Sequence, residues 1–352
     1  MAFGCPICMR QAMDRRAFLI GAGAALAVGA GAAEAAQRRS ASSGLGMIDV
    51  HHHIIPPAYL DWYRSLNPPS VGQNDWTPQH SLEMMDRNGI ACGITSLLTP
   101  GVALADDFPR GRTIARGCNE YAAQLGSDHP GRFGMFASLP ALDPEGSVAE
   151  VGHAFDMLHA DGAGLMTSYR GKYLHDPLFA PMLAELDRRH AVVFVHPNWQ
   201  LQIDPAQTDM VLLEMPFDTA RCLLGLIKSG TLARYPNLKW IFAHGGGALP
   251  ILYQRIDYRF ARDPRLHGLY PNGMVAALSN VYFDIVGVSG ALPFRFVEGV
   301  YGDGKLLFGT DYPAVDGETT TSLFGALRLT PQQRATIGRG NAERLFPRLT
   351  QR

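Results

Sequence analysis

Three consecutive histidines stand in the stretch IDVHHHIIPP, and they are the first residues of the chain whose type and spacing suit a metal ion. If residues 46–52 form a β-strand, alternate side chains share a face, so His51 and His53 point the same way. Asp49 then shares that face, whereas His52 points to the other side. Two imidazoles at this spacing can hold one divalent cation if other parts of the chain supply further ligands. The alternative is a solvent-exposed polar tract, because histidine-rich runs are common on protein surfaces.

Further candidate ligands end three other apolar runs. His196 closes AVVFVHP, His244 closes LKWIFAH, and Asp311 lies near the end of KLLFGTDYP. A single histidine at a strand end is usually only hydrogen-bonded, but polar residues at four strand ends favour one shared site. Neutral imidazole and carboxylate are ligands of a divalent ion such as zinc. The other histidines fall in loops or helices and are interpreted as surface or capping groups: His80, His129, His153, His159, His175, His190 and His267.

The candidate residues suit different tasks. Asp311 can bind an ion through one carboxylate oxygen and move a proton with the other. His244, beside the ion but not bound to it, suits a general acid or an electrophile. The glycines of HGGG also offer backbone N–H groups to an anion, although a triple glycine often serves only tight packing.

Eight apolar runs must position these residues, and they alternate with amphipathic segments typical of helices. This alternation predicts a parallel sheet flanked by helices, and the near-continuous hydrophobicity indicates strands buried on both faces. Eight such units in about 300 residues favour a closed (β/α)8 TIM barrel. The alternative, a doubly wound sheet, would need a glycine-rich turn after the first strand, where HHHIIPP stands instead. The runs cover residues 46–52, 90–98, 132–140, 162–169, 191–197, 238–245, 281–287 and 305–313.

Two further segments complete the expected barrel, which spans residues 46–350. The proline-rich segment 56–79 is too long for a plain connection, so we expect a lid-like insertion after strand 1. Residues 329–346 read as a terminal helix that packs back on the barrel.

The first 36 residues have the layout of a twin-arginine export signal, which predicts a periplasmic protein. Arg15 and Arg16 precede an Ala/Gly-rich apolar run that ends in small residues at 33–35. That run is short and weakly apolar for a membrane span, so no stable membrane insertion is expected, although an uncleaved anchor is the alternative. A signal would more naturally begin at Met13, so residues 1–12, which carry the CPIC pair, are interpreted as a start-codon artefact.

The composition of the chain limits the classes of partner that we expect it to bind. The chain has 352 residues, 47% of them hydrophobic, and a formal net charge of −1. A near-neutral chain without a basic cluster argues against nucleic acid and leaves small molecules or a neutral protein surface as the expected partners. After removal of the signal, only Cys92, Cys118 and Cys222 remain, and three separated cysteines predict buried free thiols.

The motifs DVHHH, VFVHP, HGGG followed by LPILYQRID, and FGTDYP together resemble the amidohydrolase superfamily, in particular its aminocarboxymuconate-semialdehyde decarboxylase-like branch. The likeness runs from about residue 46 to 346, and longer stretches resemble 6-methylsalicylate decarboxylase-type members. The resemblance implies a metal held by His51, His53, His196 and Asp311, with His244 as a catalytic residue. The chain carries Thr310 where the branch usually has serine before the aspartate, and the hydroxyl is retained.

The resemblance implies non-oxidative decarboxylation of a hydroxylated aromatic acid such as 6-methylsalicylate. One divalent ion, zinc first and manganese second, would bind the substrate, and Asp311 would donate the proton with help from His244. The branch is often homodimeric, which we also expect here. Hydrolysis of a lactone, ester or amide through a metal-bound water is the alternative, and a non-catalytic barrel is a third. The candidate pocket residues lie just past strand ends or at a helix start: Trp199, Tyr169, Arg170 and Phe217.

Overall fold

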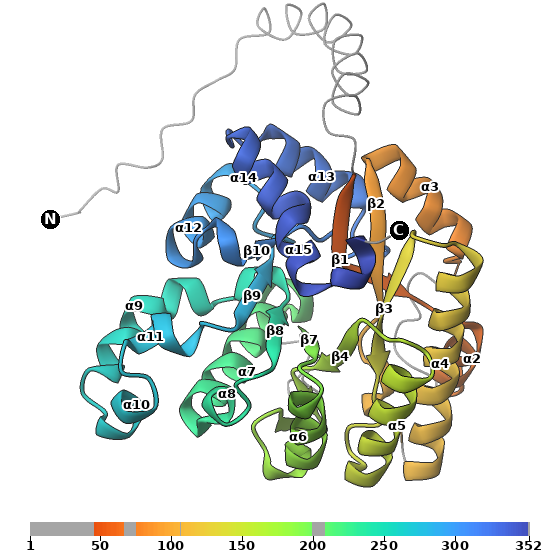
Figure 1. The fold of residues 1–352 in the computed structure, drawn as a ribbon, viewed down its shortest axis with the longest axis horizontal. Helices are drawn as coiled ribbons and strands as arrows, with labels where there is room; N and C mark the ends of the chain where they lie inside the picture. Colours follow the sequence, from red (N-terminus) through yellow and green to blue (C-terminus); the bar gives the residue numbers. More distant parts are fainter. Residues whose placement is uncertain (1–45, 67–74, 106, 199–207, 351–352) are drawn as a thin grey trace, which may run out of the picture. The chain divides into compact units, whose positions relative to one another are not determined.

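Eight parallel strands form the centre of the computed structural model, which describes residues 46–350 apart from 67–74, 106 and 199–207. Each strand pairs with the next one along the chain in parallel register, as a (β/α)8 barrel requires (Figure 1). A small antiparallel hairpin, β5 (Ser168–Tyr169) and β6 (Lys172–Tyr173), follows the fourth strand. The barrel strands are β1 (Met47–Ile54), β2 (Ile90–Leu97), β3 (Phe133–Ser138), β4 (Gly162–Met166), β7 (Val192–His196), β8 (Lys239–Phe242), β9 (Val281–Asp284) and β10 (Leu306–Leu307).

The residues that follow β10 close the barrel against β1. Phe308 O accepts a hydrogen bond from Val50 N at 3.0 Å, and Asp311 N donates to His51 O at 2.7 Å. The predicted closed barrel is therefore confirmed, and the open doubly wound sheet is wrong. The last strand is much shorter than residues 305–313, because Phe308 N and Thr310 N donate to Ile337 O and Asp49 Oδ1 and not to the backbone of a neighbouring strand.

Helices surround the barrel, as Figure 1 shows. Several begin where a polar side chain caps the first free backbone N–H groups: Thr77, Asp107 and Asp143 each accept a hydrogen bond from the residue three positions later. The longer helices are α3 (Pro78–Asn88), α4 (Phe108–Asp128), α5 (Pro144–Asp156), α6 (Ala180–Arg188), α7 (Met215–Ser229), α9 (Leu249–Phe260), α12 (Ala291–Tyr301) and α13 (Gly317–Ala326). Short helices are α8 (Thr231–Arg234), α10 (Pro264–Leu269) and α11 (Gly273–Ala277).

The expected terminal helix is one helical run with a π-helical turn in its middle. The turn η6 (Thr336–Gly340) separates α14 (Pro331–Ala335) from α15 (Asn341–Leu345). Ile337 in this turn is buried, and its carbonyl accepts a hydrogen bond from Phe308 N at 3.0 Å. The run therefore packs back on the last strand, as expected.

The barrel interior is filled with hydrocarbon below its carboxyl-end rim. The side chains that fill it are buried and come from alternate strand positions, so the barrel is a packed core and not a channel. This core includes Ile48, Val50, Ile94, Phe136, Phe194, Ile241 and Leu307.

A β-bulge in β1 corrects one expectation. Asp49 pairs with Gly93 but His52 pairs with Thr95, so β1 carries one extra residue between these positions. Val50 packs in the barrel core, and Asp49 hydrogen-bonds the ring of His52. Asp49 therefore lies on the His52 side of the strand, and its predicted position on the face of His51 is wrong.

The expected lid-like insertion is only partly within the described residues. Its first part is the helix α2 (Pro57–Ser65), whose Tyr59, Trp62 and Tyr63 are buried. Residues 67–74 lie outside the described residues, so the lid stays a prediction.

The predicted export signal, residues 1–36, and the CPIC pair also lie outside the described residues. Among the residues that are described, no helix has the length and apolar character needed to cross a membrane. Cys92, Cys118 and Cys222 are free thiols and all three are buried, as expected.

Candidate active site

Four predicted metal ligands meet at the rim of the barrel. The candidate ligand atoms of His51, His53, His196 and Asp311 all lie within 4.8 Å of one another, and the four residues are buried. Asp311 Oδ1 lies 3.1 Å from His51 Nε2 and 3.0 Å from His53 Nε2. Among the described residues, His196 Nε2 is buried without a hydrogen-bond partner, which is costly unless another group binds it. Three imidazoles and one carboxylate fit a divalent ion.

The other nitrogen of each histidine ring is held by a neighbour. Asp284 Oδ2 lies 2.7 Å from His51 Nδ1, and Ser96 Oγ lies 3.1 Å from His53 Nδ1. His196 Nδ1 lies 2.8 Å from both Thr99 Oγ1 and Pro197 O. Such contacts leave Nε2 free for a metal and fix the orientation of each ring.

Sequence analysis missed the three side-chain partners, Asp284, Ser96 and Thr99. Asp284 lies in the middle of the predicted run 281–287, VYFDIVG, so the strand-end argument applied to the other ligands passed over it. Ser96 and Thr99 left no comparable signal, because small hydroxyl side chains are common near strand ends.

Burial and nearby charges set the protonation of the cluster. Burial lowers the pKa of His53 and lowers the pKa of His196 further, so both rings are neutral, as metal ligands must be. Burial also opposes a charge on His51, but the carboxylates of Asp311 and Asp284 raise its pKa to about 10. Burial acts to raise the pKa of Asp311, yet His51, His244 and His53 bring it well below its usual value. A metal ion must therefore displace the proton on His51.

His244 stands beside the cluster on the other oxygen of Asp311. It lies in the short 3-10 turn η4 (His244–Gly246), and its Nε2 is 3.2 Å from Asp311 Oδ2. His244 N donates to Asp284 Oδ1 at 2.9 Å, so the same buried aspartate holds both His51 and His244. His244 and Asp311 have positive φ angles of 57° and 62°, a left-handed conformation that few residues other than glycine adopt.

Comparison with known proteins places this fold and site in a family. The amidohydrolase family model matches residues 48–348. The chain belongs to the amidohydrolase family. It is 36% identical to the decarboxylase yanB of Aspergillus niger over 323 residues, which cover 86% of this chain and 87% of the relative. It is 33% identical to a 6-methylsalicylic acid decarboxylase of Penicillium expansum, over 87% of this chain and 97% of the relative.

A solved structure supports the same assignment. The dihydroxybenzoic acid decarboxylase of Polaromonas, solved with bound manganese and the inhibitor 2-nitroresorcinol, is 26% identical to this amidohydrolase. The match covers 86% of this chain and 97% of that chain, with a TM-score of 0.74.

The middle histidine of the HHH run, His52, has a structural role in this amidohydrolase. His52 Nδ1 lies 3.1 Å from Asp49 Oδ2, and its Nε2 lies 2.8 Å from Ser81 Oγ. Asp49 also accepts hydrogen bonds from Thr310 N at 3.0 Å and from Thr310 Oγ1 at 2.6 Å. This network joins β1 to the segment that carries Asp311, and the hydroxyl of Thr310 is part of it.

The HGGG glycines serve packing rather than an anion site. The N–H groups of Gly246 and Gly247 donate to the carbonyls of Ala243 and His244. A Cβ atom at Gly247 would lie 2.1 Å from Pro216 O, so only glycine allows this approach of the two backbones.

Asp218 on α7 holds the backbone on both sides of His196. Its Oδ2 accepts hydrogen bonds from Thr167 Oγ1 and, at 3.0 Å, from Asn198 N. Thr167 N in turn donates to His196 O at 2.8 Å. Asp218 is fully buried, so these bonds are shielded from water. Sequence analysis did not single out Asp218.

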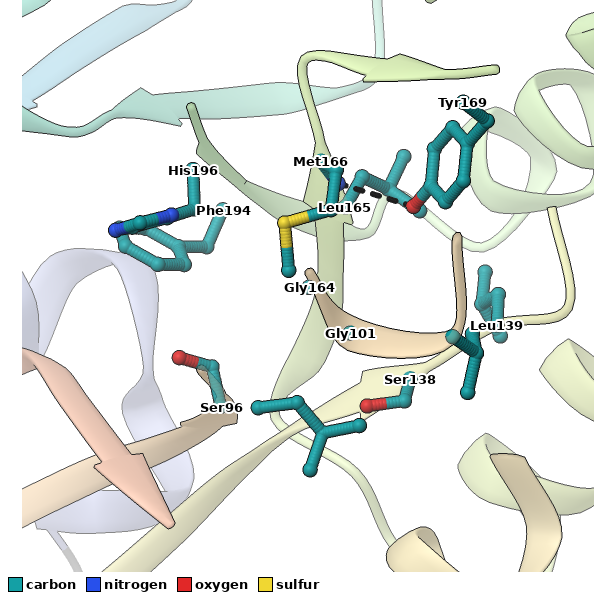
Figure 2. Close-up of a pocket in the computed structure, with 12 residues that line it drawn as sticks. Ser96, Gly101, Ser138, Leu139, Gly164, Leu165, Met166, Tyr169, Phe194 and His196 are labelled. Atoms are coloured by element: carbon teal, nitrogen blue, oxygen red, sulfur yellow. Dashed lines mark hydrogen bonds between the residues drawn. The ribbon is translucent and has the colours of Figure 1, made fainter. Parts of the chain in front are cut away.

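The four residues predicted to line the substrate pocket occupy different places. Tyr169 lines a pocket beside His196, shown in Figure 2, and its hydroxyl oxygen accepts a hydrogen bond from Met166 N at 2.9 Å. Arg170 is exposed at the turn of the β5–β6 hairpin and donates to Ala105 O at 3.0 Å. Phe217 is 40% exposed on the first turn of α7, and Trp199 lies outside the described residues.

Proposed function

We propose that this protein is a metal-dependent, non-oxidative decarboxylase that releases carbon dioxide from a hydroxylated aromatic acid resembling 6-methylsalicylate. The observation that carries the proposal is the division of Asp311 between the histidine cluster and His244. One oxygen of this carboxylate faces three ligand histidines, and the other faces a group that can exchange protons. The 6-methylsalicylic acid decarboxylase of Penicillium expansum supports this substrate class, and the decarboxylase yanB of Aspergillus niger supports the reaction type.

We propose that His51, His53, His196 and Asp311 hold one divalent ion. When bound, the ion would supply a positive centre for the carboxylate of the substrate and its ortho hydroxyl. The histidine-rich ligand set favours zinc, whereas the manganese in the Polaromonas structure supports manganese as the alternative. Metal analysis of protein purified without added metal distinguishes the two.

The protein residues then account for the proton balance. Asp311 delivers a proton to the ring carbon that bears the carboxylate, and the carbon–carbon bond breaks with its electron pair returning to the ring. One C–H bond replaces one C–C bond, so no oxidant or reductant is needed. His244 Nε2 is 3.2 Å from Asp311 Oδ2 and is placed to restore the proton to Asp311. The reaction consumes one proton and releases one carbon dioxide for each turnover.

The hydrolase alternative finds no support among the relatives reported above, which are named as decarboxylases. The same residues would suit a metal-bound water, so an assay must decide. The test is carbon dioxide release from 2-hydroxybenzoates by the metal-loaded protein, with lactones as the parallel substrates. Carbon dioxide release without lactone opening supports the proposal, and the reverse result contradicts it.

We also propose export by the twin-arginine route to the periplasm. The supporting features are the Arg15–Arg16 pair, the apolar run after it and the small residues at 33–35. This route carries folded proteins, which suits an enzyme that binds its metal before export. A homodimer is proposed from the family resemblance, and its test is the molecular mass in solution.

A further inference from the structure

The pocket in Figure 2 opens directly beside the metal-ligand cluster. His196 belongs to both, and Ser96 in the pocket wall lies 3.1 Å from the His53 ring. Phe194, also in the wall, packs edge-on against the His51 ring with centroids 4.9 Å apart. An aromatic substrate whose carboxylate is held at the metal-ligand cluster therefore has its ring next to this pocket, on the side of the barrel formed by β2 to β4.

The walls of this pocket are mainly hydrocarbon. Among the described lining residues no lysine, arginine, aspartate or glutamate occurs, so the pocket offers no ionic partner to a substrate. The Tyr169 hydroxyl accepts a hydrogen bond from Met166 N, and the Ser96 hydroxyl lies 3.1 Å from His53 Nδ1. The polar side-chain groups of the wall are these two hydroxyls, the hydroxyl of Ser138 and the His196 ring. The apolar side chains of the wall are Leu97, Val102, Leu139, Leu165, Met166 and Phe194.

Met166 is a side chain of the pocket wall that is packed between two neighbours. Figure 2 shows it between His196 and Tyr169. Its sulfur lies 3.9 Å from Thr99 Oγ1, the hydroxyl that also holds His196. On the other side, a Cβ atom at Gly101 would lie 2.8 Å from the Met166 methyl carbon, so Met166 rests on bare backbone. The position of the Met166 side chain thus depends on the absence of one at Gly101.

We propose that this pocket is the subsite for a non-polar substituent of the aromatic ring and that Met166 determines its specificity. The protein then prefers 2-hydroxybenzoates that carry a methyl or other short alkyl group over dihydroxybenzoates. A methyl group gains from leaving water for hydrocarbon walls. A second hydroxyl group loses its hydrogen bonds to water and finds few partners there. The inference rests on the proposed decarboxylase function and adds which substituent the site selects.

The test compares 2-hydroxy-6-methylbenzoate with 2,6-dihydroxybenzoate on the metal-loaded protein. We expect kcat/KM to be at least about 10-fold higher for the methyl compound, the size of effect that one apolar group produces in an apolar pocket. Met166→Gln places an amide of similar length in the wall and should lower this ratio by about 10-fold. Met166→Leu keeps the wall apolar and should preserve the preference. An equal or reversed preference in the unaltered protein overturns the inference, as does an unchanged ratio in Met166→Gln.

Two further measurements keep the test decisive. Val102→Thr, which keeps the side-chain shape, serves as the second polar variant if Met166→Gln does not fold, and it should shift the ratio in the same direction. Binding of the two decarboxylation products, 3-methylphenol and resorcinol, reports on the subsite without turnover. Tighter binding of 3-methylphenol together with no carbon dioxide release would support the subsite and contradict the proposed function. Equal binding of both phenols together with carbon dioxide release would contradict the subsite alone.

Discussion

The carboxylate of Asp311 is shared between two environments, and His244 occupies the second of them. Oδ1 faces His51 and His53 at 3.1 and 3.0 Å, whereas Oδ2 lies 3.2 Å from His244 Nε2. Both residues have strained left-handed backbones that bring the two side chains together. On this geometry rests our proposal that metal binding and proton exchange use different oxygens of one side chain.

Substitution of His244 should separate the two tasks. His244→Asn is expected to retain bound metal but to lose about 10²–10⁴-fold in kcat, because an amide hydrogen-bonds but does not exchange protons at neutral pH. Asp311→Asn should lose more activity and also bind metal more weakly, since it removes an anionic ligand. Steady-state kinetics and metal content measured on the same preparations check both. A His244→Asn protein that has lost its metal would contradict the assignment.

The three ligand histidines should differ from their neighbour His52. His51→Ala, His53→Ala or His196→Ala should each abolish metal binding and nearly all activity. His52→Ala should keep its metal. It removes the hydrogen bonds of the His52 ring to the buried side chains of Asp49 and Ser81, so it should lower the unfolding free energy by about 1–3 kcal/mol. Metal content and denaturant unfolding measure the two effects. Loss of metal in His52→Ala with retention in His51→Ala would show that the strand faces are assigned wrongly.

Asp218 should act on the metal site through the backbone around His196. Asp218→Ala removes the bonds to Thr167 and Asn198 and should weaken metal affinity by about 10-fold or more, as loss of supporting hydrogen bonds typically does. Asp161→Ala is the matched control. The Asp161 carboxylate is also buried, but Asp161 lies just before the first residue of β4, at the end of that strand opposite to Thr167. Its Oδ2 accepts a hydrogen bond from Met135 N at 2.9 Å. Asp161→Ala should lower the stability of the protein without changing its metal affinity. Equal losses of metal affinity in Asp218→Ala and Asp161→Ala would reject the positioning role of Asp218.

Export depends on the paired arginines if the N-terminal assignment is right. Arg15→Lys combined with Arg16→Lys should leave an uncleaved precursor in the cytoplasm. Cell fractionation and the mass of the recovered protein measure this. Normal periplasmic recovery of the double variant would exclude the twin-arginine route.

Much of the fold and rim could be predicted from the sequence, because apolar strands that end in polar residues report directly on a parallel barrel. His51, His53, His196 and Asp311 were found in this way, and the structure brings them together. The bulge in β1 could not be predicted, since one extra residue leaves the hydrophobic pattern almost unchanged.

The supporting contacts were harder to foresee. Asp218 and Met166 approach the site only through tertiary packing, and neither has a type or spacing that distinguishes it from an ordinary helix or strand residue. The short β10 depends on hydrogen bonds from Phe308 N and Thr310 N to groups outside the strand ladder, which the sequence pattern does not report.

The central claim is that the protein replaces a ring carboxylate with a proton. The most direct measurement is turnover of 2-hydroxy-6-methylbenzoate by the metal-loaded protein in heavy water, followed by analysis of gas and product. The account predicts one carbon dioxide per substrate and 3-methylphenol with one deuterium at the carbon that lost its carboxylate. Absence of carbon dioxide from every hydroxybenzoate tested, together with opening of a lactone by the same metal-loaded preparation, would contradict it.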